Sequence, residues 1–308
     1  MYDIIVVGAG PAGMTAAIYA RRASKSVLIL DGKSYGGQII NTLDIENYPA
    51  EEHISGFDFA TKLYNQAKNL GTEFIFEKVL EIKNYNSYKK IITTKNQYKC
   101  KAVILATGSK NRLLGLRNEK DFIGKGISYC ATCDGAFYKN KVVAVIGGGN
   151  SALDSALYLS DIAKLVYIIH RRDQFTGSQA TLEKLKSKNN VKFILNSTVT
   201  KLNPSNISSN KKLESIEISD KEKNSTVLNL DGLFVAIGRI PENESFVKIL
   251  NLNSQGYIKS DETCKTEISG IFAAGDIREK NLRQLVTATS DGAIAATEAV
   301  NFINEIHS

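Results

Sequence analysis

The stretch from Tyr2 to Asp31, YDIIVVGAGPAGMTAAIYARRASKSVLILD, is the most informative part of the chain. It contains an apolar run, a glycine-rich turn, an amphipathic segment and a second apolar run, which is the pattern of a βαβ unit. Gly8 permits a tight turn, Gly10 lets the backbone approach a pyrophosphate, and Gly13 allows the helix to pack closely on its strand. The stretch therefore predicts a dinucleotide site, with the phosphates at the positive N-terminal end of the helix.

A second glycine-rich stretch, KVVAVIGGGNSALDSALYLSDIAKLVYIIHRR, runs from Lys141 to Arg172 and repeats this pattern. The first unit ends in Asp31, whose carboxylate suits ribose hydroxyls, whereas His170 occupies the matching offset here and is followed by Arg171 and a second arginine. Guanidinium groups match a 2′-phosphate that a carboxylate would repel. We therefore expect the second site to prefer NADP over NAD, and the two sites to bind different dinucleotides.

The C-terminal part of the chain also resembles part of a nucleotide-binding domain. The stretch from Gly270 to Val300 contains an apolar strand, a Gly-Asp turn and an apolar helix. Glycine and proline signals near 106–112 and 236–243 suggest two hinges. We expect an α/β fold with two Rossmann-like, three-layer nucleotide-binding domains, one inserted into the other. The expected bounds are 1–112 and 241–308 for the outer domain and 113–240 for the inserted domain.

Composition excludes several other classes of protein. The chain has 308 residues, of which 43% are hydrophobic, and this is enough for about two domains. The net charge is +7, but the lysines are spread among polar residues and are interpreted as solvated faces. The first residues lack a basic region, and the apolar run Ile4–Val7 is too short for a signal peptide or a membrane span. We expect a soluble, cytoplasmic protein that binds no nucleic acid and no membrane.

Two cysteines three positions apart, Cys130 and Cys133, lie in the stretch ISYCATCDGAFY. A structural zinc site would need about four ligands, and the remaining cysteines, Cys100 and Cys264, stand alone. An inert disulfide would add little stability, because closing a short loop removes little entropy from the unfolded chain, and the cytosol opposes its formation. We expect no metal site, and we interpret the pair as a redox-active dithiol.

Asp134 directly follows the second cysteine. A thiolate that attacks a disulfide releases another thiolate that must be protonated, and a carboxyl group can supply the proton if partial burial raises its pKa. The alternative is that Asp134 only forms a turn before Gly135. The local sequence leaves both interpretations open.

The chain resembles the low-molecular-weight thioredoxin reductases, which are FAD- and NADPH-dependent flavoproteins, over nearly its whole length. The matching blocks are, in order, GAGPAGMTAAIYA, GGQIINTLDIENYP, ATGS, CATCDG, VIGGGNSALDSALYLS, HRRDQF, FVAIGRIP and FAAGDIREKNLRQLVTATSDG. The resemblance implies an FAD domain formed by both ends of the chain, an inserted NADPH domain that carries the cysteine pair, and a homodimer. It also implies that thioredoxin is the protein substrate.

The resemblance assigns cofactor-binding residues as well. Those implied for FAD are Gly8, Gly10, Pro11, Ala12, Gly13, Asp31, Gly36, Gly37, Gln38, Asn47, Gly108, Gly275, Asp276, Arg283, Gln284 and Leu285. Those implied for NADPH are Gly147, Gly149, Asn150, Ser151, His170, Arg171, Arg172 and Arg239. Family members commonly have a further basic residue after HRRDQF, where this chain has Thr176. We therefore expect one phosphate contact to be missing and the preference for NADPH to be relaxed.

In the family that the chain resembles, the second cysteine faces the flavin and the first attacks the protein substrate. This implies that Cys133 is the flavin-side thiol, Cys130 the interchange thiol and Asp134 the acid–base group. A reductase of another small redoxin, glutaredoxin-like or peroxidase-linked, would carry the same motifs. A ferredoxin–NADP reductase-like enzyme would have no use for the cysteine pair. The last alternative is a non-enzymatic redox sensor that acts on nucleic acid, and no motif in the sequence supports it.

Overall fold

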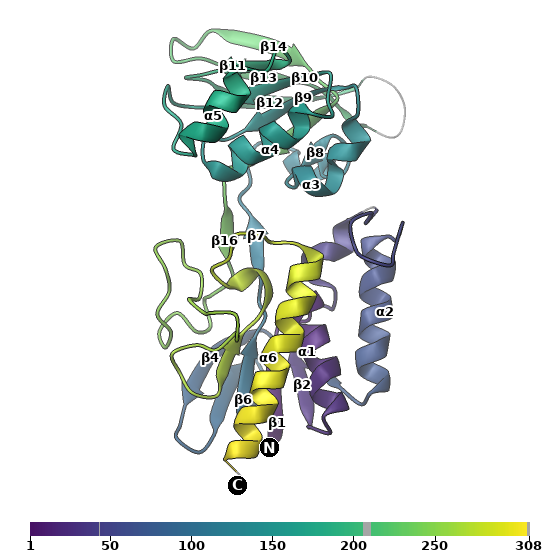
Figure 1. Ribbon diagram of the computed structural model, residues 1–308, viewed down its shortest axis with the longest axis vertical. Helices are drawn as coiled ribbons and strands as arrows, with labels where there is room; N and C mark the ends of the chain where they lie inside the picture. Colours follow the sequence, from purple (N-terminus) through teal and green to yellow (C-terminus); the bar gives the residue numbers. More distant parts are fainter. Residues whose placement is uncertain (43, 206–210, 307–308) are drawn as a thin grey trace. The chain divides into compact units, whose positions relative to one another are not determined.

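The computed structural model describes residues 1–42, 44–205 and 211–306. These residues form two compact units (Figure 1). One contains Met1–Lys110 together with the chain from Ile240 onward, and the other contains Asn111–Arg239. The two connections between the units pair with each other as short strands, β7 (Ser109–Asn111) and β16 (Arg239–Pro241).

The first unit is built on a seven-stranded sheet with the order β3-β2-β1-β6-β5-β4, in which β17 also pairs with β6. Strands β1, β2, β3, β6 and β17 are parallel, and β4 and β5 are antiparallel additions. Because β6 is long, its first half pairs with β5 and its second half with β17. The strands are β1 (Tyr2–Val7), β2 (Val27–Leu30), β3 (Glu73–Ile75), β4 (Val79–Asn84), β5 (Lys89–Thr93), β6 (Gln97–Leu105) and β17 (Ile271–Ala273).

Alternation along β1 produces the layers of this unit, because successive side chains point to opposite faces of a sheet. Ile4 and Val6 enter the core under the helices, whereas Ile5 and Val7 enter the core on the other face. Burying each such side chain stabilises the fold by about 1.5–3 kcal/mol. The helices are α1 (Pro11–Arg22), α2 (Gly56–Asn69) and α6 (Leu285–Glu305). Helix α6 lies beside α1, and a Cβ at Gly292 would lie 2.2 Å from a backbone oxygen of α1 (Figure 1).

The second unit has a five-stranded parallel sheet with the order β11-β10-β9-β15-β8. Its strands are β8 (Ile127–Ser128), β9 (Val142–Ile146), β10 (Leu165–Ile169), β11 (Val191–Ile194) and β15 (Gly232–Val235). One face is covered by helices α3 (Ala131–Asp134), α4 (Asn150–Ser160) and α5 (Gln179–Lys186). The other face is covered by an antiparallel sheet of β12 (Thr198–Pro204), β13 (Leu213–Ser219) and β14 (Ser225–Asn229).

The expected α/β class with Rossmann-like, three-layer units is confirmed. In each unit the helix after the central strand starts at a glycine: Gly10 caps α1, and Gly149 caps α4. Ligands of such folds bind outside the carboxyl ends of the parallel strands, where these two helices begin. Within the described residues, no helix combines the length and the apolar character needed to cross a bilayer.

Candidate functional site

The glycine loop between β1 and α1 is closely packed on one side and open on the other. Gly8 has a φ of +114°, and a Cβ there would lie 2.3 Å from the carbonyl oxygen of Ala106. A Cβ at Gly13 would lie 2.0 Å from the carbonyl oxygen of Gly8, so both positions exclude a side chain. A Cβ at Gly10 would meet only the Cα of Gly37, at 3.9 Å. The backbone at Gly10 is therefore accessible to a ligand at the start of α1.

Asp31 ties the end of β2 to this loop. Its Oδ2 accepts a hydrogen bond from the backbone N–H of Ala9 at 2.9 Å, and its Oδ1 accepts one from the amide two positions further along the chain, also at 2.9 Å. The backbone N–H of Gly36 donates to the carbonyl oxygen of Ala9 at 2.8 Å, which brings the turn containing Gly37 and Gln38 to the same place. The half-buried carboxylate keeps lone pairs that can accept hydrogen bonds from hydroxyl groups.

The C-terminal segment contacts α1 and the segment around Asn47. A Cβ at Gly275 would lie 2.8 Å from the Cβ of Ala12, and Asn47 Nδ2 donates to Gln284 Oε1 at 3.2 Å. Gln284 is also the N-cap residue of α6. Most of the residues expected to bind FAD therefore meet at one edge of the unit, and their chain neighbours follow them there: Pro11, Asp276 and Leu285.

Two further residues expected to bind FAD are Arg283 and Gly108. The guanidinium of Arg283 lies 4.1 Å from the ring centroid of Tyr257, and its Nε is buried without a hydrogen-bond partner among the described residues. Gly108 has a φ of +72°, and a Cβ there would meet no atom within 4 Å. A buried N–H group without a partner is costly, so the Nε of Arg283 suits the acceptor atom of a ligand.

The second glycine loop, between β9 and α4, is supported by His170. Gly147 has a φ of +147°, and a Cβ there would lie 2.4 Å from the carbonyl oxygen of Ala236. A Cβ at Gly148 would lie 2.2 Å from the ring of His170. The His170 side chain is nearly buried, at 9% exposure, and its ring stacks on Phe175 with 5.0 Å between centroids. The ring therefore packs under the loop and leaves little of its own surface for a nucleotide.

The segment after β10 is hydrogen-bonded to the same loop. The backbone N–H of Thr176 donates to the carbonyl oxygen of Gly148 at 2.8 Å, and its hydroxyl donates to the same oxygen at 3.3 Å. The backbone N–H of Ser178 donates to Asn150 Oδ1 at 2.7 Å. Thr176, which stands where members of the resembled family commonly have a basic residue, thus holds the loop in place.

The positive charges expected to bind a phosphate lie outside this packing. Arg171 and Arg172 are both exposed at the end of β10, and Ser151 is exposed in the first turn of α4. Arg239 lies in β16, where its Nε donates to Asn111 Oδ1 at 3.1 Å. The two arginines after His170 therefore carry the accessible charge of this site.

Cys130 and Cys133 form a disulfide at the start of α3, with their Cα atoms 5.3 Å apart. Asp134 lies beside them: its backbone N–H donates to the carbonyl oxygen of Cys130 at 3.1 Å, and its Oδ2 accepts a hydrogen bond from Ser128 Oγ at 2.5 Å. Burial raises the pKa of Asp134 above its ordinary value of 3.8, although the bond from Ser128 lowers it. A carboxyl group of raised pKa beside a disulfide can exchange a proton with a thiolate.

Residues 2–292 match the family model described as pyridine nucleotide-disulphide oxidoreductase. The chain belongs to this family. Membership makes the protein an oxidoreductase that uses a flavin and a pyridine nucleotide. The expected enzyme class and the resemblance inferred from the sequence blocks are confirmed.

Similar proteins cover the chain almost completely. A thioredoxin reductase of Listeria innocua is 39% identical over 99% of this chain and 95% of its own length. A protein of Clostridium pasteurianum, described as a 34.2 kDa protein in a rubredoxin operon, is 42% identical over 98% of this chain and 97% of its own length. The crystal structure of a thioredoxin reductase from Streptococcus pyogenes has a TM-score of 0.93 at 39% identity and covers 99% of both chains.

Glu119 of this oxidoreductase supports the disulfide segment, and the sequence pattern did not reveal it. Its side chain is buried and accepts backbone hydrogen bonds from Leu114 at 2.8 Å and from Gly115 at 2.9 Å. It also accepts a bond at 2.7 Å from the hydroxyl of Tyr129, the residue before Cys130. In the sequence, Glu119 lies in a charged stretch that is typical of a surface, and only its burial distinguishes it.

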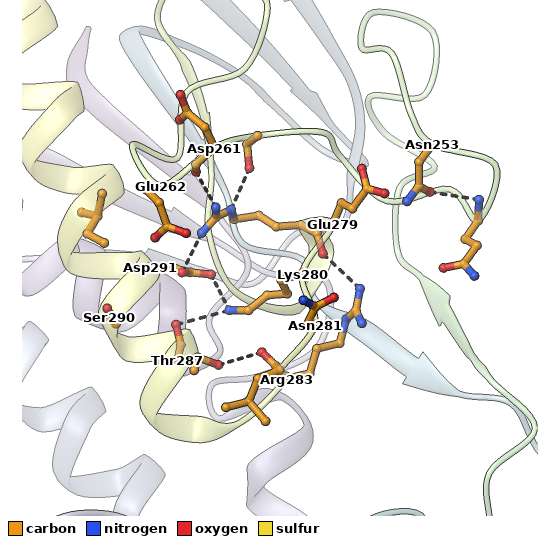
Figure 2. Close-up of a pocket in the computed structure, with 15 residues that line it drawn as sticks. Asn253, Asp261, Glu262, Glu279, Lys280, Asn281, Arg283, Thr287, Ser290 and Asp291 are labelled. Atoms are coloured by element: carbon orange, nitrogen blue, oxygen red, sulfur yellow. Dashed lines mark hydrogen bonds and ion pairs between the residues drawn. The ribbon is translucent and has the colours of Figure 1, made fainter. Parts of the chain in front are cut away.

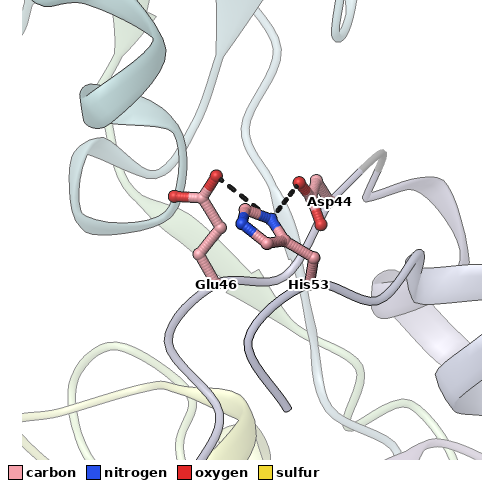
Figure 3. Close-up of side chains that lie close together, drawn as sticks. All are labelled: Asp44, Glu46 and His53. Atoms are coloured by element: carbon pink, nitrogen blue, oxygen red, sulfur yellow. Dashed lines mark hydrogen bonds and ion pairs between the residues drawn. The ribbon is translucent and has the colours of Figure 1, made fainter.

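A second cluster that the sequence did not predict lies on the surface of the first unit (Figure 3). His53 Nδ1 lies 2.9 Å from Asp44 Oδ2 and 3.7 Å from Glu46 Oε1. An antiparallel bridge between Ile45 and Ile54 brings these side chains together, since residues flanking a bridge share one face. The hydrogen bond that the His53 ring donates to Asp44 raises the pKa of His53 above 6.5. Because the His53 side chain is 68% exposed, solvent screens this ion pair.

Proposed function

We propose that this oxidoreductase is a thioredoxin reductase, which carries electrons from NADPH through FAD and the Cys130–Cys133 disulfide to oxidised thioredoxin. The observation that carries the proposal is the disulfide beside Asp134, a carboxyl group of raised pKa, in a chain with two dinucleotide-type glycine loops. The names of the similar proteins from Listeria innocua and Streptococcus pyogenes support the same acceptor.

The first unit fits FAD. The open backbone at Gly10 leaves room for a pyrophosphate, and Asp31 offers a carboxylate for ribose hydroxyls. The buried Nε of Arg283 has no hydrogen-bond partner among the described residues and would donate to a polar atom of the cofactor. These features lie on the edge of the sheet where α1 and α6 begin.

The second unit fits NADPH. The loop at Gly149 opens at the N-terminal end of α4, and Arg171 and Arg172 are exposed at the end of the neighbouring strand. Two guanidinium groups would bind the 2′-phosphate that distinguishes NADPH from NADH. His170 contributes by packing under the loop. Since Thr176 adds no charge, we propose that the preference for NADPH rests on the two arginines.

When bound, NADPH supplies a hydride and FAD relays its two electrons. Two-electron reduction breaks the bond between the sulfurs of Cys130 and Cys133 and leaves two thiolates. The Cys130 thiolate attacks the disulfide of thioredoxin and forms a mixed disulfide, and the thioredoxin thiolate that leaves takes a proton from Asp134. The Cys133 thiolate then attacks the Cys130 sulfur, which re-forms the internal disulfide and releases the second thiolate of thioredoxin. Solvent protonates that thiolate and restores the proton on Asp134.

The proposal can be tested by anaerobic titration of the purified protein with NADPH, following flavin absorbance and free thiols. The wild type should take up about four electrons per subunit, two in the flavin and two in the disulfide, and oxidised thioredoxin should reoxidise it. Cys133→Ser should stop at about two electrons. Cys100→Ala is the matched control, because Cys100 is fully buried and burial raises its pKa to about 12.

Other outcomes would reassign the function. If about two electrons enter the wild type and no thiol appears, the disulfide is not part of the electron path and a ferredoxin–NADP reductase-like activity replaces the proposal. If four electrons enter but another small redoxin is reduced faster than thioredoxin at equal concentration, the acceptor is that redoxin. The relative from Clostridium pasteurianum, which carries no reductase name, makes this comparison of acceptors necessary. We also propose a homodimer, which light scattering of the purified protein would test.

A further inference from the structure

The carboxylate of Asp291, on α6, contacts the segment 275–280 at three separate points (Figure 2). Its Oδ2 accepts hydrogen bonds from the backbone N–H of Gly275 at 2.9 Å and from Lys280 Nζ at 2.7 Å. Its Oδ1 accepts a bond from Arg278 Nη1 at 2.6 Å. The side chain of Asp291 is only 9% exposed, so these bonds are shielded from solvent. One helix residue thus holds the start, the middle and the end of this segment.

Arg278 links these contacts of Asp291 to Arg283. Its guanidinium is also fixed by Ser260 Oγ at 2.7 Å and by the carbonyl oxygen of Asp261 at 2.5 Å. The carbonyl oxygen of Arg278 accepts a bond from Arg283 Nη2 at 3.1 Å. Because the Arg283 guanidinium also packs on Tyr257, its buried Nε is held in one direction.

Asp291 provides the negative charge that balances Arg278 and Lys280 in this cluster. Two cations, Arg278 and Lys280, lie within 2.7 Å of its carboxylate oxygens, and their side chains are 7% and 13% exposed. Removing the carboxylate charge would leave two buried cations facing each other across an uncharged group. The cluster borders a polar cavity of about 620 Å³ that Lys280 and Arg283 also line (Figure 2). The segment would then be free to move toward that space.

We propose that Asp291 is a positioning residue for FAD binding. It holds the backbone next to Asp276 through Gly275, and it holds the side chain of Arg283 through Arg278. The inference rests on the proposed function, in which Arg283 meets FAD, and on the resemblance, which implies the same for Asp276. Asp291 itself acts only through these neighbours.

The test is the affinity of the apoprotein for FAD, measured by quenching of flavin fluorescence, in wild type and in Asp291→Asn. The variant keeps an oxygen acceptor but loses the charge, and its Kd for FAD should rise at least tenfold while its Kd for NADPH stays unchanged. The visible circular dichroism of the bound flavin should change as well. The control is Glu298→Gln on the same helix, which removes a partly exposed ion pair with Lys265 and should leave both affinities unchanged.

The outcomes separate the inference from the function on which it rests. A wild-type protein that binds no FAD would refute the proposed function. A folded Asp291→Asn protein that binds FAD as tightly as wild type, even with a lower melting temperature, would refute the positioning role. If that variant does not fold, Arg278→Met and Lys280→Met replace it. Each of them removes one of the two cations that contact the Asp291 carboxylate. The first should weaken FAD binding at least threefold and more than the second, and unchanged affinity in both would overturn the inference.

Discussion

Ser128 offers a direct test of how Asp134 works. The Ser128 hydroxyl is buried and donates to Asp134 Oδ2 at 2.5 Å, and this bond lowers the pKa of a carboxyl group that burial raises. A hydrogen bond to a charged group is worth about 1.5–3 kcal/mol, and about 1.4 kcal/mol corresponds to a factor of ten. Ser128→Ala should therefore make Asp134 hold its proton about ten- to a hundredfold more tightly.

The assay is single-turnover reduction of oxidised thioredoxin by the prereduced enzyme, followed by stopped-flow across a series of pH values. If protonated Asp134 supplies the proton to the leaving thiolate, the rate falls where Asp134 loses that proton, and Ser128→Ala should move this fall to higher pH. The variant also removes the acceptor of the Cys130 backbone N–H at 3.1 Å, which can change the rate by itself. The diagnostic result is therefore the pH at which the rate falls, not the size of the rate.

Two controls make the result decisive. Ser160→Ala removes another buried hydroxyl of the same unit, which donates to the carbonyl oxygen of Leu157 at 2.6 Å, and it should leave the pH profile unchanged. Asp134→Asn should abolish the pH-dependent fall, because no carboxyl group remains to titrate. A profile for Ser128→Ala that coincides with wild type would refute the assignment of Asp134 as the proton donor.

Three other predictions concern separate parts of the chain. In Gly148→Ala the new Cβ would lie 2.2 Å from the His170 ring, so the loop must shift; titration with NADPH should show a Kd raised at least tenfold with normal flavin content, and an unchanged Kd would contradict the packing. Glu119→Gln weakens several bonds to a buried carboxylate and should lower the free energy of unfolding by about 2–4 kcal/mol in urea denaturation, whereas a loss under about 0.5 kcal/mol would show that the loop is held by other contacts. His53 should titrate by NMR above its ordinary pKa, and Asp44→Asn should remove most of the shift. Since the folded pKa is the higher one, the stability from this pair is present at low pH and lost as pH rises through that pKa.

The glycine loops illustrate what could be predicted from residue order. Gly8, Gly13 and Gly147 pack against backbone atoms at distances that exclude a Cβ, and the lack of a side chain is visible in the sequence itself. The strand and helix that surround each loop follow directly along the chain, so the motif is local. The spacing of Cys130 and Cys133 likewise permits a disulfide within one turn of chain.

Other parts of the site depend on contacts that residue order does not specify. Glu119 lies in a charged stretch and Asp291 in a largely apolar helix. Their burial and partners appear only when distant loops and helices are packed together. The resemblance implies that His170 helps to hold NADPH, and only the structure shows that its ring stacks on Phe175 under the glycine loop. In the second sheet, β15 lies between β9 and β8, although a long stretch of chain separates it from both.

The sequence alone determined the two βαβ units, the cysteine pair and the family to which the chain belongs. Each of these depends on residue types at short, regular spacing, where backbone sterics and side-chain alternation act within one element or between neighbouring elements. The tertiary structure decided which charged groups are buried, which of them hold the loops, and that burial raises the pKa of Asp134. Desolvation and hydrogen bonding are set by all the atoms that surround a group, and packing brings those atoms together from distant parts of the chain.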